Sequence, residues 1–441
     1  MADLDLIKIG EVIRKVRKSR GLRLEDLADQ KISSATVSNI ERGVPHVGSE
    51  KVMYLLDKLG ITLDQIPEIL EEENEKLEEL LNQLMAVESK LNIIDNQKLL
   101  NQLHDLPIDD QHKLAAYRHY LMGRCYFNLK DLKRAERSFY NAIRLAGLSS
   151  FNKVNNIEAL SFNELGICSF YQNDLEQAIQ YTENALETVD GDSWIKYKFA
   201  CNKAAYLEKL GRIGETMKIV QELWHHIEKM DIDTALNLYD IRTNVFRKSK
   251  MFREAIQCAK EGIEKARLTD KRDRLFELWT ALGSVYLSIQ DWNKAETCLL
   301  TAVEIGETIE LHRVLISAYT KLGILYTRLQ KEKEAEESLN RAIQLGKDTN
   351  NAIPLTYAYL MMGDLDQCRG NILGSTDFYK KALELSRKIR NKNLEYKALF
   401  RLAKLKKGDS REEFLSVLEN MYEVAATISE ESKEEESDEI L

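Results

Sequence analysis

The sequence predicts an all-α protein with a small N-terminal domain, a helical linker and a long superhelical repeat. Small residues recur at a nearly constant interval that settles at 40 residues: Ala135, Ala178, Thr216, Ala255, Ala295, Ala335 and Ser375. Aromatic and apolar residues keep fixed distances from most of them, as in helical hairpins that bury their apolar faces only by stacking on neighbours. The 441 residues contain only four prolines, so long helices are rarely interrupted.

The repeat unit is clearest around Gly283. Gly283 and Ala295 are small where two antiparallel helices should cross closely, while larger residues such as Tyr286 and Leu299 fill the space beside the crossing. This pattern resembles the tetratricopeptide (TPR) signature, with a unit longer than the common one of ~34 residues. The resemblance implies seven helical hairpins and a C-terminal cap within residues 114–428, stacked as a solenoid with a concave inner wall.

Residues 1–63 do not follow this period and are expected to form a separate domain of short helices. The predicted helices span Ile7–Ser19, Leu24–Gln30, Ser34–Glu41 and Glu50–Leu59, with a last turn near Thr62. A tight connection separates the second helix from the third, and Gly43 supplies a C-terminal stop after the third. This arrangement predicts a helix-turn-helix.

The run V-S-N-I-E-R-G, which ends at Gly43, resembles the Xre/Cro type of DNA-binding domain. The resemblance implies that the third helix enters the major groove of duplex DNA and contacts bases and phosphates through Ser34, Ala35, Thr36, Ser38 and Asn39. Members of that family usually carry a Gln at the start of the second helix, where it touches a phosphate. This chain has Arg23 and Leu24 there, and Arg23 is expected to take over the contact.

The charge of the N-terminal domain agrees with DNA binding only modestly, because 11 Lys and Arg stand against 9 Asp and Glu. The basic residues are concentrated, however, in one ten-residue stretch: Arg14, Lys15, Arg17, Lys18, Arg20 and Arg23. Alone, such a cluster would be read as a solvated helix face. Beside a helix-turn-helix, it favours contacts with DNA phosphates.

Residues 64–113 hold 13 acidic and 4 basic residues, so this segment is expected to be a helical linker that does not touch nucleic acid. Apolar residues in it follow two interleaved heptad series: Leu77, Leu84 and Leu91, and Leu80, Val87 and Ile94. Such a seam either pairs two subunits in a coiled coil or packs against the first repeat hairpin. The sequence leaves both alternatives open.

Several classes of function are disfavoured. The sequence shows no apolar run approaching ~18 residues, so a membrane span is not expected and the protein should be cytoplasmic. The six cysteines are scattered singly, which predicts reduced thiols and neither disulfides nor a metal site. No triad-like grouping or H-E-x-x-H run occurs, so neither enzymatic activity nor a cofactor is expected. Residues 429–441 carry seven acids and one lysine and are expected to be disordered.

Amide side chains should gather on the inner wall of the solenoid. Counted from the repeat register, the candidate binding positions on the first helices are Asn163, Asn202, Asn237, Asn244 and Arg247. An Asn side chain offers both donors and an acceptor, so it can hold the backbone of an extended peptide whatever its sequence. Each single Asn could equally be a solvated helix residue, but their alignment across neighbouring repeats favours a peptide groove.

An Xre-type domain, a helical linker and a TPR array together resemble the peptide-responsive quorum-sensing regulators of the RRNPP family, in particular its PlcR-like and NprR-like branch. The resemblance implies a transcriptional regulator that binds a roughly palindromic DNA site as a homodimer or higher homo-oligomer. A short oligopeptide held by Asn163, Asn202 and Asn244 would switch its oligomeric state or its DNA binding.

Two other functions remain open at this stage. One is a Rap-like adaptor that binds a phosphorelay response regulator and promotes its dephosphorylation. The other is a TPR scaffold that assembles proteins, against which the N-terminal domain argues.

Overall fold

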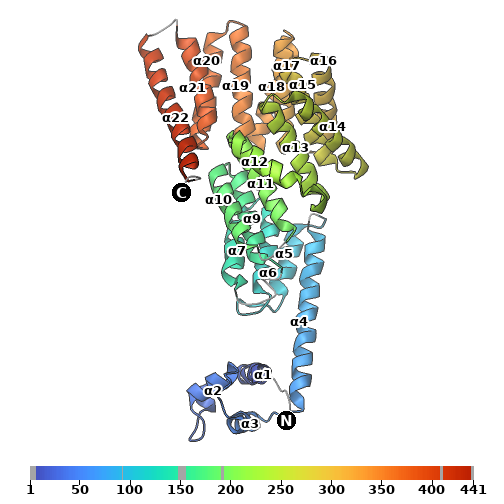
Figure 1. The fold of residues 1–441 in the computed structure, drawn as a ribbon, viewed down its shortest axis with the longest axis vertical. Helices are drawn as coiled ribbons and strands as arrows, with labels where there is room; N and C mark the ends of the chain where they lie inside the picture. The colour runs from blue at the N-terminus through green and yellow to red at the C-terminus, as the bar shows by residue number, and fades with distance from the viewer. Residues whose placement is uncertain (1–5, 92, 148–154, 190–192, 408–410, 439–441) are drawn as a thin grey trace. The chain divides into compact units, whose positions relative to one another are not determined.

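The computed structural model describes residues 6–91, 93–147, 155–189, 193–407 and 411–438, and this part of the chain is helical without a single strand (Figure 1). The predicted all-α fold class is therefore confirmed. The chain divides into two compact units, residues 1–108 and residues 109–441. The acidic segment therefore belongs largely to the N-terminal unit.

The described residues of the N-terminal unit form five α-helices and one short 3-10 helix: α1 (Leu6–Ser19), η1 (Glu25–Leu27), α2 (Ser34–Glu41), α3 (Ser49–Lys58), α4 (Gln65–Lys90) and α5 (Asn96–Asp105). Its core contains Ile13, Val37, Leu55 and Leu59, which are almost completely buried. Ile66 belongs to the same core, so α4 begins inside this small domain and not after it.

The first helix of the helix-turn-helix is much shorter than predicted. The sequence predicts a helix over Leu24–Gln30, whereas only the 3-10 helix η1 forms. The Asp29 carboxylate accepts hydrogen bonds from the backbone N–H groups of Lys31 (2.8 Å) and Ile32 (3.1 Å). Because this side chain offers the backbone an alternative to helical bonding, the chain turns at Asp29.

The heptad seam of α4 is partly buried within the single chain. Leu84, Val87 and Leu91 are at most 8% exposed, while Leu77 and Leu80 are half-buried. Helix α5 contacts α4 and lies beside its upper end in Figure 1. Leu84, Val87 and Leu91 are thus covered within the single chain, whereas Ile94, the last residue of the seam, is 41% exposed.

The second unit is a row of helical hairpins. Its first helices are α6 (Ala115–Asn128), α9 (Ile157–Tyr171), α11 (Ile195–Leu210), α13 (Ile232–Lys248), α15 (Arg272–Ser288), α17 (His312–Arg328), α19 (Ala352–Cys368) and α21 (Lys392–Lys406). Their partners are α7 (Leu132–Ala146), α10 (Leu175–Thr188), α12 (Ile213–Trp224), α14 (Phe252–Leu268), α16 (Trp292–Thr308), α18 (Glu332–Asp348), α20 (Ile372–Lys388) and α22 (Arg411–Asp438). A short 3-10 helix, η2 (Ile227–Lys229), follows α12. In the described part of the chain, seven hairpins run from α6 to α20, and α21 and α22 follow them where the sequence predicts a C-terminal cap.

The small residues that define the period are packing positions. All seven of them, from Ala135 to Ser375, are 0% exposed. The glycine of the first helix is equally restricted, since a Cβ on Gly323 would lie 2.4 Å from Cγ of Leu339. A side chain at Gly323 would therefore push the two helices of the hairpin apart, which explains the conserved spacing within the chain.

The hairpins stack in two layers. First helices of consecutive repeats contact each other, as α11 does with α13, α13 with α15 and α17 with α19. Each second helix instead contacts the first helix of its own hairpin and that of the next. The first helices therefore form the inner wall of the solenoid, as the repeat register predicts.

The C-terminal tail differs from its prediction. Helix α22 continues to Asp438 and so includes most of the segment from Ser429 for which the sequence analysis expects disorder. Glutamate has a favourable helix propensity, and no proline or glycine interrupts the chain after Arg411. Residues 439–441 lie outside the described part of the chain.

No helix in the described part of the chain is both long and apolar enough to span a bilayer. Within the same part, no three His, Cys, Asp or Glu side chains gather in a way that suits a metal ion. The six cysteines are all unpaired, and five of them are buried.

Candidate functional site

Helix α2 carries the five residues that the sequence analysis assigns to DNA. Ser33 precedes it as the N-cap, and its hydroxyl accepts the backbone N–H of Thr36 at 3.2 Å. Ala35 is exposed, whereas Ser34, Thr36, Ser38 and Asn39 are half-buried. The N-terminal part of α2 thus carries a small polar surface, which is suited to contacts with base edges.

Arg42 joins this surface, although the sequence analysis did not assign it a contact. Its Nη2 donates to Oδ1 of Asn39 at 2.5 Å, and its Nε donates to the carbonyl of Ser38 at 3.3 Å. The guanidinium therefore fixes the orientation of the Asn39 amide. The sequence signal was available, because Arg42 lies one helical turn after Asn39 and Ser38.

One member of the basic cluster is structural. Arg17 is buried, and its Nε and Nη2 donate to the two carboxylate oxygens of Glu41 at 2.6 and 3.0 Å. Its Nη1 donates to the carbonyl of Leu22 at 2.8 Å. Arg17 therefore ties α1 to α2 and cannot neutralise a phosphate, which corrects the prediction for this residue.

Four of the other five basic side chains are exposed: Arg14, Lys18, Arg20 and Arg23. Lys15 is half-buried. The backbone N–H of Arg23 donates to Oδ2 of Asp26 at 2.7 Å, so the backbone of Arg23 is held at the start of η1 while its side chain stays on the surface.

The turn before α2 is fastened to α3. Oδ2 of Asp29 accepts hydrogen bonds from Nζ of Lys58 (2.7 Å) and from the hydroxyl of Tyr54 (2.8 Å). The hydrogen bond from the Lys58 ammonium is the largest cause that lowers the pKa of Asp29. Since the same carboxylate also binds the backbone of the turn, Asp29 sets the position at which α2 begins.

In the second unit, two of the predicted amide residues contact each other. Nδ2 of Asn202 on α11 donates to Oδ1 of Asn163 on α9 at 2.9 Å. Asn163 is only 1% exposed, and within the described residues its Nδ2 has no hydrogen-bond partner. Asn163 is therefore less open than the sequence analysis expects, and it retains an unused donor.

The remaining three predicted residues lie along one face of α13. Asn237, Asn244 and Arg247 are half-buried, as is Asp240 between them. Nδ2 of Asn244 donates to the carbonyl oxygen of Asp240 at 3.1 Å and to its Oδ1 at 3.3 Å. Their spacing of three and four residues places these side chains on one helical stripe.

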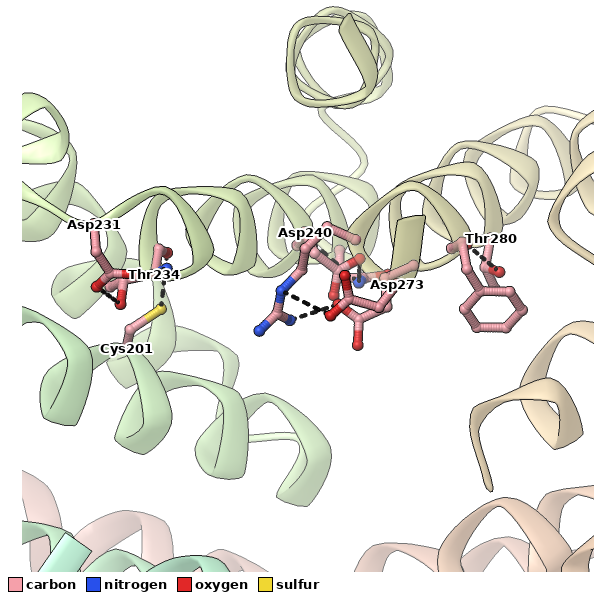
Figure 2. A network of polar contacts seen from close by, with 10 residues as sticks. Cys201, Asp231, Thr234, Asp240, Asp273 and Thr280 are labelled. Atoms are coloured by element: carbon pink, nitrogen blue, oxygen red, sulfur yellow. Dashed lines mark hydrogen bonds and ion pairs between the residues drawn. The ribbon is translucent and has the colours of Figure 1, made fainter. Parts of the chain in front are cut away.

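Local capping orients α13. The Asp231 carboxylate accepts from the backbone N–H of Thr234 (3.0 Å) and from its hydroxyl (2.6 Å). The Thr234 carbonyl in turn accepts a weak bond from Sγ of Cys201 at 3.8 Å, which links α11 to α13. Figure 2 shows this capping group at one end of α13 and Asp240 further along the same helix.

Hydroxyl groups on the next two first helices do not extend this polar stripe. The hydroxyls of Thr280, Ser284 and Thr320 donate to carbonyls of their own helices at 2.7–2.8 Å, and each residue is 5% exposed. Figure 2 shows Thr280 in this arrangement. These residues therefore contribute to packing and not to a binding surface, which the sequence pattern alone did not reveal.

Charged residues from four first helices converge on the inner wall. Burial, followed by the nearby Glu277 and Glu208, raises the pKa of Asp240. Burial, followed by the nearby Arg247, lowers the pKa of Lys321 to about 7. Lys321, Glu208 and Glu277 were not predicted as site residues. The sequence analysis searched the inner wall for amide residues, and these three side chains are charged. Their proximity becomes apparent only in the folded structure.

The solenoid also closes on itself. Asn173, at the turn after α9, donates from Nδ2 to the carbonyl of Asn350 (3.3 Å), and its Oδ1 accepts the backbone N–H of Ala352 (3.1 Å). The Arg313 guanidinium lies 4.3 Å from the ring centroid of Tyr171. These contacts join residues up to 179 positions apart, so the second repeat meets the sixth and seventh across the superhelix.

Protein-family models match segments of both units. A helix-turn-helix family model matches residues 13–66, and tetratricopeptide-repeat models match residues 116–147 and 274–348. No curated protein matches the chain significantly.

Solved structures share the solenoid fold. The structure of NprR in complex with its cognate peptide NprX aligns with a TM-score of 0.59 at 13% identity, over 80% of this chain and 99% of that one. A Rap protein complexed with competence and sporulation factor aligns with a TM-score of 0.52 at 17% identity, over 80% of this chain and 99% of the other. At these identities the likeness establishes the fold.

The chain is thus a helix-turn-helix protein with a C-terminal TPR solenoid. These two parts are the ones that the resemblance of the sequence implies.

Proposed function

We propose that the protein is a DNA-binding transcriptional regulator whose TPR unit binds a short oligopeptide, and that this peptide switches its oligomeric state or its DNA binding. The observation that carries the proposal is the combination, in one chain, of a helix-turn-helix with a polar recognition surface and a TPR solenoid whose inner wall holds amide side chains. Both parts are proposed to act in the cytoplasm without a metal or cofactor.

Three features of the N-terminal unit support DNA binding. Helix α2 begins at a capped N-terminus, its polar residues are accessible, and Arg14, Lys18, Arg20 and Arg23 are exposed nearby in the sequence. A single small domain reads few base pairs, so a specific site would require two copies on a roughly palindromic sequence. We therefore propose a dimer or higher homo-oligomer as the active form.

The amide donors and acceptors on the inner wall support peptide binding. Asn163 has an unused buried donor, and Asn202, Asn237 and Asn244 lie on neighbouring first helices. Peptide backbones carry one N–H and one C=O for each residue, and an Asn side chain can bond both. The cognate peptide of NprR is bound by a protein of the same fold, which makes a peptide the proposed ligand here.

The test has two stages. The purified protein is first mixed with genomic DNA fragments in a gel-shift assay, and the bound sites are footprinted. We expect protection of a two-fold site. Short peptides released by the host cell are then titrated calorimetrically against the wild type and against the double variant Asn163→Ala, Asn244→Ala.

The second stage should show a peptide that binds the wild type and binds the double variant at least ten-fold more weakly, because each truncation leaves a peptide group unpaired. Equal affinity for both proteins would refute the amide clamp. Absence of specific DNA binding, together with capture of a response regulator, would instead support the Rap-like adaptor. Absence of both activities would leave a scaffold.

A further inference from the structure

We infer that Asn39 and Arg42 read the DNA major groove as one unit, and that the base this pair selects is guanine. The inference rests on the proposed DNA-binding function and specifies one base of the recognition site. It gives Arg42 a part in sequence preference, in addition to any attraction between its charge and the phosphates.

The backbone around Arg42 is held on both sides. Arg42 is the C-cap residue of α2. Glu41 before it is buried in its ion pair with Arg17. Gly43 after it has a φ of 65° and packs against α1, where an added Cβ would lie 2.7 Å from Cα of Ile7. The Arg42 side chain therefore begins at a fixed point at the end of the recognition helix.

This side chain turns back over the last turn of α2. Its Nε donates to the carbonyl of Ser38 at 3.3 Å, and its Nη2 donates to Oδ1 of Asn39 at 2.5 Å. Within the described residues, Nη1 of Arg42 and Nδ2 of Asn39 make no hydrogen bond. The pair therefore presents free N–H donors, while the oxygen of the Asn39 amide is already bonded to a cation.

Guanine is the base whose major-groove edge fits a pair of donors. It carries two neighbouring acceptors, N7 and O6, whereas adenine carries one acceptor and one donor. A free Asn side chain binds adenine through its oxygen and its nitrogen together. In this protein Nη2 of Arg42 already donates to that oxygen, and the positive charge beside it disfavours the approach of the adenine N–H donor. Cytosine offers a donor, and thymine only a single acceptor beside a methyl group.

The alternative is that Arg42 binds a phosphate and leaves Asn39 to read adenine. Arg42 is exposed, so a phosphate could reach it. A phosphate contact through Nη1 alone, however, keeps the bond from Nη2 to Asn39 and leaves the Asn39 amide as a donor. Adenine is favoured only if the two side chains separate, and that separation gives up a charge-assisted hydrogen bond.

The test selects binding sites for the full-length protein from synthetic DNA duplexes with a random central region. The selected duplexes are sequenced for the wild type, Asn39→Ala and Arg42→Ala. The base that the pair contacts is the one whose preference is lost in Asn39→Ala. Arg14→Ala is the matched control, because Arg14 is an exposed arginine on α1 and its loss should weaken binding to all duplexes alike.

The wild type and Arg14→Ala should select guanine over adenine at this position by at least ten-fold. Arg42→Ala frees Oδ1 of Asn39, so its preference should move from guanine to adenine by at least ten-fold. 7-Deazaguanine lacks the N7 acceptor. Placed in turn at each guanine of the wild-type site, it should weaken wild-type binding several-fold at one position of each half-site. This last measurement needs no variant protein, so it holds even if Arg42→Ala folds poorly.

Three results would reject the pair as a guanine reader and leave DNA binding intact. They are another base at the position that Asn39→Ala relaxes, no relaxed position at all, and no guanine at which 7-deazaguanine matters. A fourth result is an unchanged guanine preference in Arg42→Ala, with uniformly weaker and less salt-dependent binding. It would also overturn the inference, because Arg42 would then be a phosphate contact. If the wild type enriched no sequence, the proposed DNA-binding function itself would fall.

Discussion

Nδ2 of Asn202 donates a hydrogen bond to the side-chain oxygen Oδ1 of Asn163 at 2.9 Å. This bond joins α11 to α9 across 39 positions of the chain. Asn163 is buried, and its own Nδ2 has no partner within the described residues. The hydrogen bonding of the pair is therefore incomplete, because one amide donor of Asn163 is unused.

This pair should show energetic coupling. Asn202→Ala leaves the buried Asn163 amide without its remaining partner, so we expect a loss of about 1–3 kcal/mol in the free energy of unfolding. A double-mutant cycle with Asn163→Ala, measured by urea unfolding, should give a non-additive result because the second truncation removes an amide that is already unpaired. Asn293→Ala, on the exposed face of α16, is the control and should change stability little. Strict additivity would show that the contact does not stabilise the solenoid.

Recognition of DNA should depend on α2. The double variant Thr36→Ala, Asn39→Ala removes polar groups that are expected to meet base edges, so sequence preference should fall by roughly ten-fold or more. Non-specific affinity, which depends on charge, should persist. Footprinting of the variant against the wild-type site measures the outcome, with circular dichroism as the check on folding. An unchanged footprint would mean that the recognition surface lies elsewhere.

The sequence predicted the fold of the repeat unit better than it predicted individual side-chain contacts. The repeat register located the seven hairpins from α6 to α20, because small residues such as Ala295 are required where two helices cross closely. The sequence could not show that Arg17 is buried against Glu41, since the two are 24 positions apart and a basic residue within a basic cluster looks like its neighbours. Lys321 was missed for a related reason, because Arg247, which contributes to its lowered pKa, lies two repeats earlier in the chain.

Truncation of the heptad seam in α4 should lower the stability of the single chain. Leu84 is 0% exposed in the single chain, whereas Leu77 is half-buried. Leu84→Ala should therefore cost about 2–5 kcal/mol of stability, and Leu77→Ala clearly less. Thermal unfolding of both variants compares them, and sedimentation reports any change of oligomeric state. If Leu77→Ala weakened self-association without loss of stability, the N-terminal half of the seam would be the subunit contact.

The pH dependence of the free energy of unfolding should reveal the protonation state of Lys321. Burial, followed by the charge of Arg247, lowers its pKa from 10.5 to about 7, with Lys209 acting in the same direction and Asp240 and Glu208 opposing it. In the unfolded chain the lysine stays protonated up to about pH 10. Between pH 7 and pH 10 the unfolded state therefore binds more protons, so the free energy of unfolding should rise with pH across this window.

The variant Lys321→Met should remove that rise and should be more stable than the wild type at pH 6, where the buried ammonium is fully charged. Lys347→Met, on the exposed part of α18, should leave the pH profile unchanged. Asp240 has the opposite effect in a lower pH range. Burial raises its pKa, so its contribution to stability falls as the pH rises toward neutrality. Urea titrations at pH 6, 7, 8 and 9 on all three proteins measure the effect, and parallel profiles for wild type and Lys321→Met would show that Lys321 is solvated and carries its ordinary pKa.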